Sequence, residues 1–375
     1  MQGLGVLGGI ALAPNLVSIA NAKVVDSALE FRQNQSLLRL HYNENSLGMS
    51  QEAIDAAKHA LATYGNIYQV EAVAELKSLL AAKNRLESSQ VLLGNGSTVI
   101  LGLVVTYANS MGATLLEPTP TFGDVSTRAK ARGMKVVQVP LESDFVTKVK
   151  QLKDAASSIK GPVLINLCNP NNPTGTIIEK TALSDWILNA PENHIFLVDE
   201  AYHEYATTNS NYESMLSLIQ QGKENVIVAR TFSKVYGMAG MRVGYGFAAP
   251  KTAEKLSSYS ASFNLTAAGL AAAKVSLKDD VFLEKSIASN LKAKKLLTDT
   301  LDDLALPYIP SSTNFVLHKI NADLETYSNR MLLNNIKVGR RMTKDDGWNR
   351  LSLGQVDEMQ AFVKTLKAFR NKGWV

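Results

Sequence analysis

A glycine-rich segment at residues 230–247 carries the residue types that carbonyl chemistry needs. It follows the apolar run Val226–Ala229, which predicts a buried strand, and it reads RTFSKVYGMAGMRVGYGF. Lys234 stands in this segment among hydroxyl groups and close in sequence to Arg242. A lysine that loses its proton through burial and nearby cations becomes a nucleophile able to form a Schiff base. Lys234 is therefore the candidate nucleophile, although a Ser-Lys pair alone is common and usually solvated.

Two more polar groups follow apolar runs of the kind that form buried strands. The motif Asn-Pro-Asn-Asn-Pro-Thr-Gly at residues 169–175 holds Asn172 between two prolines, which make a rigid mount for its amide. Asp199 ends the run Ile195–Val198, and a carboxylate there is costly to bury unless it meets a cation such as a protonated ring nitrogen. Open α/β sheets bind ligands at the carboxyl ends of their strands. An ordinary proline turn and an ordinary strand-end acid are the alternatives.

The sequence Gly-Asn-Gly-Ser-Thr at residues 94–98 predicts a strand-to-helix turn that could bind an anion. Glycines such as Gly96 allow positive φ and close backbone approach. The free amides of a helix start, with the hydroxyls of Ser97 and Thr98 beside them, suit a phosphate. Because such a turn needs glycine in any case, this motif alone is a weak signal.

These groups require an α/β framework to bring them together. Uniformly apolar runs alternate with helix-like stretches, and this pattern is typical of a mostly parallel sheet covered on both faces. The expected fold is a three-layer α/β/α large domain at residues 48–270. The predicted strands are 114–117, 135–139, 163–167, 195–198, 226–229 and 243–247.

The pattern changes after about Thr266. A long helix at 280–304 is followed by a strand at 314–318, a helix at 324–334, a strand at 350–353 and a final helix from Val356. We expect a smaller α+β domain made of residues 23–47 and 271–375. Two domains agree with the length of 375 residues, which exceeds what one core usually supports.

Composition excludes several classes of function. The net charge is +5, but the basic residues are scattered along the chain and form no cluster that would indicate nucleic-acid binding. Because Cys168 is the single cysteine, an internal disulfide framework is excluded. Cys168 lies in an apolar run, so we interpret it as a packed strand residue in preference to a nucleophile. The five histidines form no spaced ligand cluster, so we expect no metal site.

Residues 1–22 are apolar, carry no charged side chain and end in Ala-Asn-Ala. They are too short and glycine-rich for a stable membrane span, and they lack the positive start of an export signal. Two interpretations stay open: an apolar arm, which implies a cytoplasmic protein, or a trimmed signal segment, which implies export to the periplasm.

In this order and spacing, Asn-Pro-x-Asn-Pro-Thr-Gly, Asp-Glu-Ala-Tyr, and Ser-Lys followed by Gly-x-Arg-x-Gly resemble the fold-type I pyridoxal-phosphate aminotransferases of class I/II. Residues 43–48 and 94–97 are most similar to the histidinol-phosphate aminotransferase branch of amino-acid metabolism. The resemblance covers about residues 37–372. It implies a homodimer with shared active sites and pyridoxal 5′-phosphate as the cofactor.

The resemblance also implies roles for individual residues around the cofactor. Lys234 would hold the cofactor and move the proton between substrate and cofactor, while Asp199 would keep the ring nitrogen protonated. Asn172 and Tyr202 would hydrogen-bond the 3′-oxygen of the ring, and Phe122 would stack on its face. The phosphate would be bound by residues from both ends of the site and from the partner subunit, namely Gly96, Ser97, Thr98, Thr231, Ser233, Arg242 and, across the dimer interface, Tyr64.

Three residues are implied in substrate binding. Arg350 matches the arginine that binds a substrate carboxylate, with an ordinary exposed strand arginine as the alternative. Asn45 and Arg340 would help to recognise a phosphate or distal carboxylate. Ser46 departs from the family pattern, which has proline there, and the family's arginine-tyrosine-proline turn reads Thr63-Tyr64-Gly65. These departures leave the cofactor assignment intact and the amino donor open.

The expected function is transfer of an amino group between an amino acid or phosphorylated amino alcohol, similar to histidinol phosphate, and a 2-oxo acid such as 2-oxoglutarate. An aromatic or acidic amino-acid aminotransferase is one alternative. A decarboxylase or β-lyase is another, because the outcome depends on which bond to Cα stands perpendicular to the ring. A non-enzymatic sensor domain of the same fold is a third.

Overall fold

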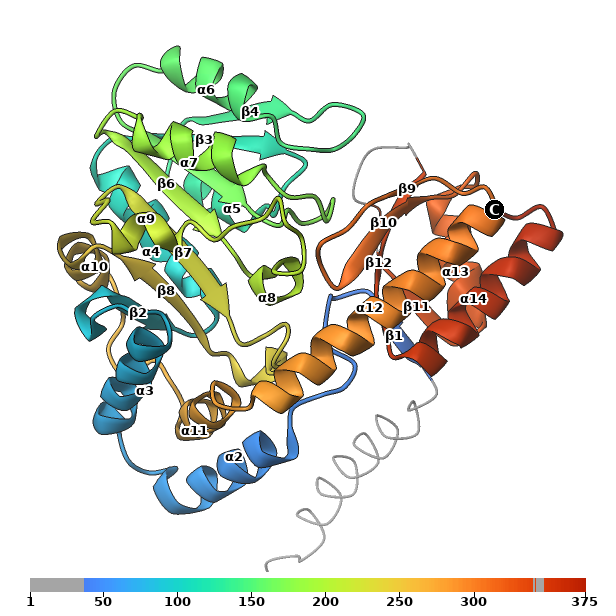
Figure 1. The fold of residues 1–375 in the computed structure, drawn as a ribbon, viewed down its shortest axis with the longest axis horizontal. Coiled ribbons are helices and arrows are strands. Elements are labelled where there is room, and N and C mark those ends of the chain that lie inside the picture. The colour runs from blue at the N-terminus through green and yellow to red at the C-terminus, as the bar shows by residue number, and fades with distance from the viewer. Residues whose placement is uncertain (1–36, 340, 342–346) are drawn as a thin grey trace, which may run out of the picture. The chain divides into compact units, whose positions relative to one another are not determined.

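The computed structural model describes residues 37–339, 341 and 347–375 (Figure 1). By its internal contacts the chain divides between Leu38 and Arg39, and residues 39–375 form one compact unit. The signal-like or arm segment expected at 1–22 and the candidate residue Arg340 lie outside the described residues.

A seven-stranded sheet forms the centre of this unit, in the order β2-β8-β7-β6-β5-β3-β4. Each strand pairs in parallel with its neighbour along the order β7-β6-β5-β3-β4. Strand β8 instead pairs antiparallel with both β7 and β2. The expected mostly parallel sheet is therefore confirmed. The strands are β2 (Val91–Gly94), β3 (Thr114–Thr119), β4 (Val136–Pro140), β5 (Val163–Cys168), β6 (His194–Asp199), β7 (Val226–Thr231) and β8 (Gly244–Ala248).

Side chains of the central strands alternate between two apolar cores, one on each face of the sheet. In β6, Ile195 and Leu197 join one core, while Phe196 and Val198 join the other. The first core is completed by α4 (Ser97–Ser110), α5 (Asp124–Ala131) and α10 (Pro250–Ser257). The second is completed by α3 (Val70–Lys83), α6 (Val149–Ser157), α7 (Lys180–Leu188), α9 (Leu216–Gln220) and α11 (Ala267–Ser276). Burial on both faces explains why these strands are apolar throughout.

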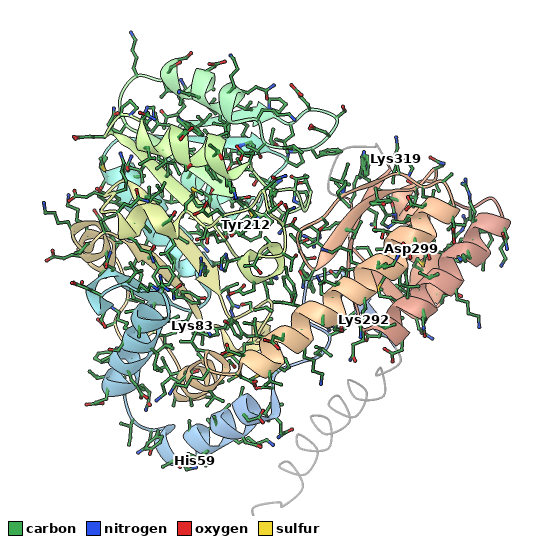
Figure 2. All side chains as sticks on the ribbon, in the orientation of Figure 1. His59, Lys83, Tyr212, Lys292, Asp299 and Lys319 are labelled. Carbon is green, nitrogen blue, oxygen red and sulfur yellow. The ribbon has the colours of Figure 1, made fainter. Side chains whose placement is uncertain are left out.

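A second, antiparallel sheet has the order β12-β10-β9, with β9 (Tyr308–Ile309), β10 (Phe315–Lys319) and β12 (Trp348–Ser352). The long helix α12 (Asp280–Asp303) matches the helix expected at 280–304, and its exposed Lys292 and Asp299 are labelled in Figure 2. The other strands and α-helices of the described residues are β1 (Leu38–Leu40), α2 (Gln51–Tyr64), α8 (His203–Ala206), α13 (Leu324–Leu333), β11 (Ile336–Val338) and α14 (Val356–Asn371). The division into a large domain at 48–270 and a small domain made of 23–47 and 271–375 stays a prediction.

Among the described residues, no helix combines the length and the apolar character that crossing a membrane requires.

Candidate active site

A cavity of about 690 Å³ lies where the carboxyl ends of β5, β6 and β7 face the start of α4. Most of the side chains predicted from the sequence line it, including Ser97, Thr98, Phe122, Asn172, Asp199, Tyr202, Thr231, Ser233, Lys234, Arg242 and Arg350. Two larger cavities, of about 810 and 940 Å³, carry few of these residues. The chemistry expected from the sequence therefore belongs to the smaller cavity.

Lys234 projects into this cavity from the loop after β7. Its Nζ donates to the backbone carbonyl oxygens of Asn43 at 3.2 Å and Tyr42 at 3.4 Å. Burial lowers the pKa of Lys234 to about 8, and the cations Arg350 and Arg242 contribute to the decrease. A neutral amine is thus accessible near neutral pH, as attack on an aldehyde requires.

Asp199 ends β6 with its carboxylate almost fully buried. Burial raises the pKa of Asp199 to about 7, although the backbone amide of Ala201 donates to Oδ1 at 3.1 Å. Within the described part of the chain Asp199 forms no ion pair. A buried carboxylate of this kind suits a ligand that brings its own positive charge.

The anion cradle at the start of α4 has the backbone that the glycine motif predicts. Gly96 has φ 81° before Ser97, and a Cβ there would overlap the guanidinium of Arg242. Gly244 is equally restricted, because a Cβ would meet the backbone of Gly96 and Ser97. Helix amides, hydroxyls and the Arg242 guanidinium thus surround a space that suits a phosphate.

On the other side of that cradle, Thr231 Oγ1 donates to Ser233 Oγ at 2.9 Å, and Arg242 Nη1 donates to the same Ser233 oxygen at 3.3 Å. Arg242 itself adopts the left-handed conformation with φ 55°. Its remaining contacts are to the backbone carbonyl oxygens of Ala239 and Asn95. These bonds hold the guanidinium beside the helix start.

Tyr202 and Asn172 approach the cavity with fixed polar groups. The Tyr202 hydroxyl accepts a hydrogen bond of 3.0 Å from Asn43 Nδ2, and burial raises the pKa of this phenol. Asn172 Oδ1 accepts a bond of 2.7 Å from Arg350 Nη1. The aromatic ring of Phe122 also lines the cavity.

These residues fit pyridoxal phosphate on four counts. The cradle suits its phosphate, Lys234 suits its aldehyde, and Asp199 suits a protonated ring nitrogen. Tyr202 and Asn172 supply polar groups for the ring oxygen. The structure thus brings together the cofactor residues expected within one chain.

Two predicted residues lie elsewhere. Tyr64 is 44% exposed at the end of α2 and lines a different cavity, so it does not reach the site of its own chain. Asn45 donates through Nδ2 to the Val235 carbonyl at 2.8 Å and to Ser286 Oγ at 3.0 Å, and it does not line the cavity. Their roles toward phosphate and substrate stay predictions.

Several cavity residues were missed by sequence reasoning. Asn43 is buried with φ 56°, and Thr121 and Asp124 line the wall beside Phe122. Asn43 begins the family-like segment 43–48, so the sequence indicated its place but not its contact with Tyr202. Cys168 also lines the cavity, where burial raises the pKa of its thiol and makes it a poor nucleophile.

No group of three or more histidine, cysteine, aspartate or glutamate residues in the described parts of the chain could hold a metal ion.

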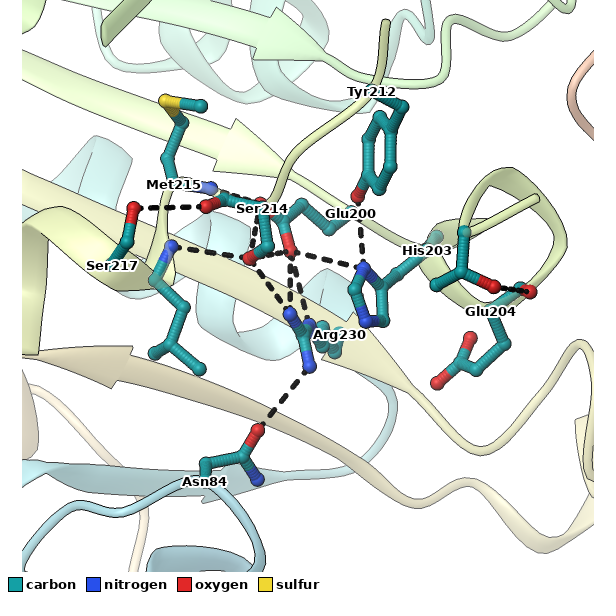
Figure 3. A network of polar contacts seen from close by, with 12 residues as sticks. Asn84, Glu200, His203, Glu204, Tyr212, Ser214, Met215, Ser217 and Arg230 are labelled. Carbon is teal, nitrogen blue, oxygen red and sulfur yellow. Dashed lines mark hydrogen bonds and ion pairs between the residues drawn. The ribbon is translucent and has the colours of Figure 1, made fainter. Parts of the chain in front are cut away.

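A buried polar network adjoins the strand ends that carry the site (Figure 3). Arg230 donates through Nε and Nη2 to Glu200 Oε2 at 3.0 and 2.9 Å. Glu200 also accepts from Ser214 Oγ and from the Met215 amide, while Arg230 reaches Asn84 Oδ1 at 3.4 Å. Because Glu200 follows Asp199 and Arg230 precedes Thr231, the pair ties together the two strand ends that hold cavity residues.

Comparison with known proteins agrees with this site. The family model for aminotransferase class I and II matches residues 35–366. The histidinol-phosphate aminotransferase of Moorella thermoacetica is 32% identical over 343 residues, which are 89% of this chain and 85% of that protein.

Solved structures give the same result. A candidate histidinol-phosphate aminotransferase from Erwinia carotovora atroseptica is 37% identical with a TM-score of 0.88, covering 91% of this chain and 98% of that one. The histidinol-phosphate aminotransferase of Sinorhizobium meliloti, solved with pyridoxal-5′-phosphate, is 26% identical with a TM-score of 0.82, covering 92% and 94%. This chain belongs to the aminotransferase class I and II family and is a pyridoxal-phosphate-dependent transaminase.

Proposed function

We propose that this transaminase takes histidinol phosphate, or a closely similar phosphorylated amino alcohol, as amino donor and 2-oxoglutarate as acceptor. The observation that carries this proposal is the 32% identity to the Moorella thermoacetica histidinol-phosphate aminotransferase along 89% of the chain. The chemistry of the cavity supports it, because Lys234, Asp199 and Arg242 line the same cavity and could serve an aldehyde, a ring nitrogen and a phosphate.

Room for a distal anionic group lies next to the cofactor cavity. A second cavity of about 810 Å³ shares Tyr42 and Arg350 with the first. Lys337 and Arg341 line it, together with the acids Asp323 and Glu325. Its cations suit the phosphate of a donor, and Arg350 suits a carboxylate of the acceptor.

We also propose roles for this chain's own residues. Pyridoxal phosphate, when bound, supplies an aldehyde and an electron-withdrawing ring. We assign Lys234 Nζ to hold the cofactor and then to carry the proton between the substrate Cα and the cofactor C4′. Asp199 would keep the ring nitrogen of the bound cofactor protonated, and Arg350 would orient the acceptor carboxylate. Proton transfer by a positioned group of this kind accounts for about 10²- to 10⁴-fold in rate.

The proposal includes a homodimer with shared sites. Tyr64 is exposed near Tyr68 and Ile67, which are 73% and 54% exposed, and these side chains form an apolar surface for a second copy of the chain. In such a dimer Tyr64 would supply its hydroxyl to the phosphate of the neighbouring site.

A donor screen with 2-oxoglutarate tests the substrates. We expect amino transfer from histidinol phosphate, which is measured by the absorption change of the bound cofactor. Transfer only from aromatic or acidic amino acids would replace the proposed donor with one of those. Release of carbon dioxide or pyruvate without amino transfer would replace transamination with decarboxylation or elimination.

A further inference from the structure

Asn43 is a buried residue at the centre of the site to which the sequence assigned no role. It lies between β1 and α2, is 1% exposed and has φ 56°. Its backbone oxygen accepts bonds from Lys234 Nζ at 3.2 Å and Asn314 Nδ2 at 3.0 Å. Asparagine is one of the few residues that adopt this left-handed backbone readily.

Ser352 contacts both the backbone and the side chain of Asn43. The Asn43 backbone N–H donates to Ser352 Oγ at 2.8 Å, and Ser352 Oγ lies 2.9 Å from Asn43 Oδ1. A serine hydroxyl has one proton, and Oδ1 can only accept, so Ser352 donates its proton to Oδ1. The structure places the NH₂ group of Asn43 on the opposite side, toward Tyr202.

This orientation determines how Tyr202 uses its hydroxyl. Asn43 Nδ2 is 3.0 Å from the phenolic oxygen, and as a donor it occupies a lone pair of that oxygen. The phenol proton does not point at Asn43 and is left for an acceptor in the cavity that Tyr202 lines. Hydrogen bonds in such a chain polarise one another, so the donor strength of Tyr202 increases.

We infer that Asn43 is a positioning residue that directs the Tyr202 hydroxyl to donate to the 3′-oxygen of the cofactor ring. The inference rests on the proposed contact between Tyr202 and that oxygen. Other ionisable groups near Tyr202 are Lys234, whose Nζ lies 5.6 Å from the ring centre, together with Arg350, Asp199 and Cys168. They remain in place when the Asn43 amide is removed.

The pH titration of the visible absorption of the cofactor-loaded protein reports this arrangement. A hydrogen bond to the ring oxygen favours its deprotonated form and lowers the pKa of that titration. Without Asn43 the Tyr202 proton is free to turn away, so the pKa rises. A neutral hydrogen bond predicts an increase of about half to one pH unit.

Asn43→Gly is the matched variant, because glycine keeps the left-handed backbone and the carbonyl that Lys234 contacts. We expect the pKa to rise in Asn43→Gly and in Tyr202→Phe. The double variant should match Tyr202→Phe, since Asn43 acts only through that hydroxyl. Ser352→Ala should raise the pKa by a smaller amount, and it should cause no further increase when it is added to Tyr202→Phe. This variant replaces Asn43→Gly as the test if Asn43→Gly fails to fold.

Asn314→Ala is the control, because it removes hydrogen bonds to the backbone oxygens of Asn43 and Glu44 and leaves the Asn43 amide facing Tyr202. Its pKa should equal that of the unchanged protein. Three results would overturn the role of Asn43 and leave the Tyr202 contact in place. They are an equal pKa increase in Asn314→Ala, additive pKa shifts in the double variant, and no pKa shift in Asn43→Gly. No shift in Tyr202→Phe would overturn both the contact and the inference. Cofactor dissociation constants for each variant provide a second readout that does not depend on turnover.

Discussion

Arg350 Nη1 donates a hydrogen bond of 2.7 Å to Asn172 Oδ1, and this bond joins β12 to the loop after β5. The same guanidinium donates through Nη2 to the His41 carbonyl at 2.9 Å and lies 5.5 Å from the Phe315 ring centre. Arg350 is 8% exposed, so these contacts hold a cation at the wall of the cavity. The residue proposed for the substrate carboxylate is thereby coupled to a residue proposed for the cofactor ring.

Replacing Arg350 with glutamine should weaken binding of the acceptor more than binding of the cofactor. Loss of a charge-assisted contact predicts a fall of about 10- to 100-fold in kcat/KM for 2-oxoglutarate. Steady-state kinetics with varied acceptor, beside a cofactor-binding titration, measures both effects. The exposed Arg132→Gln variant is the control, and an unchanged kcat/KM in Arg350→Gln would exclude the carboxylate role.

The pKa of Lys234 predicts how cofactor uptake depends on pH. With a pKa of about 8, the neutral fraction of the Lys234 amine in the cofactor-free protein reaches one half at that pH and levels off above it. The rate of pyridoxal phosphate capture should follow the same curve. Stopped-flow absorption across pH 6 to 11 checks this, since an unshifted lysine would titrate near about 10.4.

Arg350→Gln offers a second test of that pKa, because Arg350 is the largest charge that lowers it. The midpoint of the capture curve should move to higher pH in this variant. A midpoint near the ordinary lysine value in both proteins would show that burial does not act on Lys234.

The seven-stranded sheet shows what sequence patterns can predict. Runs such as Val163–Cys168 and Val226–Thr231 are apolar because both faces are covered, so their positions could be recognised. The strand order and the antiparallel placement of β8 depend on contacts distant in sequence, which no local pattern contains. The strands β9 and β11 are too short to give a periodic signal.

The site divides in a similar way. Asp199, Asn172 and Lys234 follow recognisable strands and carry chemistry of their own. Asn43 acts through a partner 159 positions away, so its residue type alone gave no signal. Its left-handed backbone became visible only in three dimensions.

Asp199→Asn should impair amino transfer strongly, because an amide cannot keep the ring nitrogen protonated. We expect the rate of the first half-reaction to fall by roughly 100-fold or more. Rapid mixing of the loaded enzyme with donor measures that rate directly. The exposed Asp154→Asn variant should behave like the unchanged protein, and a similar rate in Asp199→Asn would remove the proposed ion pair.

The buried pair Glu200–Arg230 should contribute to stability and not to substrate choice. Arg230→Met leaves the Glu200 carboxylate buried without its cation, which typically costs about 3–5 kcal/mol. Denaturant unfolding of the loaded enzyme gives the free energy. The double variant Glu200→Gln with Arg230→Met should lose less free energy of unfolding than Arg230→Met. A loss below about 1 kcal/mol in Arg230→Met would show that this ion pair is as weak as an exposed surface salt bridge.

Mixing two defective chains tests the shared site. Homodimers of Lys234→Ala lack the amine, and homodimers of Tyr64→Ala lack the hydroxyl offered to the neighbour. A hybrid dimer would contain one site with both groups, so subunit exchange should restore roughly a quarter of the full number of active sites. If exchange is shown by mass spectrometry and activity does not recover, each site is built from one chain.

A covalent bond between Lys234 Nζ and the cofactor aldehyde underlies every role proposed for this site, and borohydride reduction can detect it. Reduction converts an imine into a stable secondary amine, so peptide mapping can locate the modified lysine. We expect the phosphopyridoxyl group on the peptide that contains Lys234, with no label in Lys234→Ala. Label on a different lysine, or none on protein saturated with pyridoxal phosphate, would contradict it.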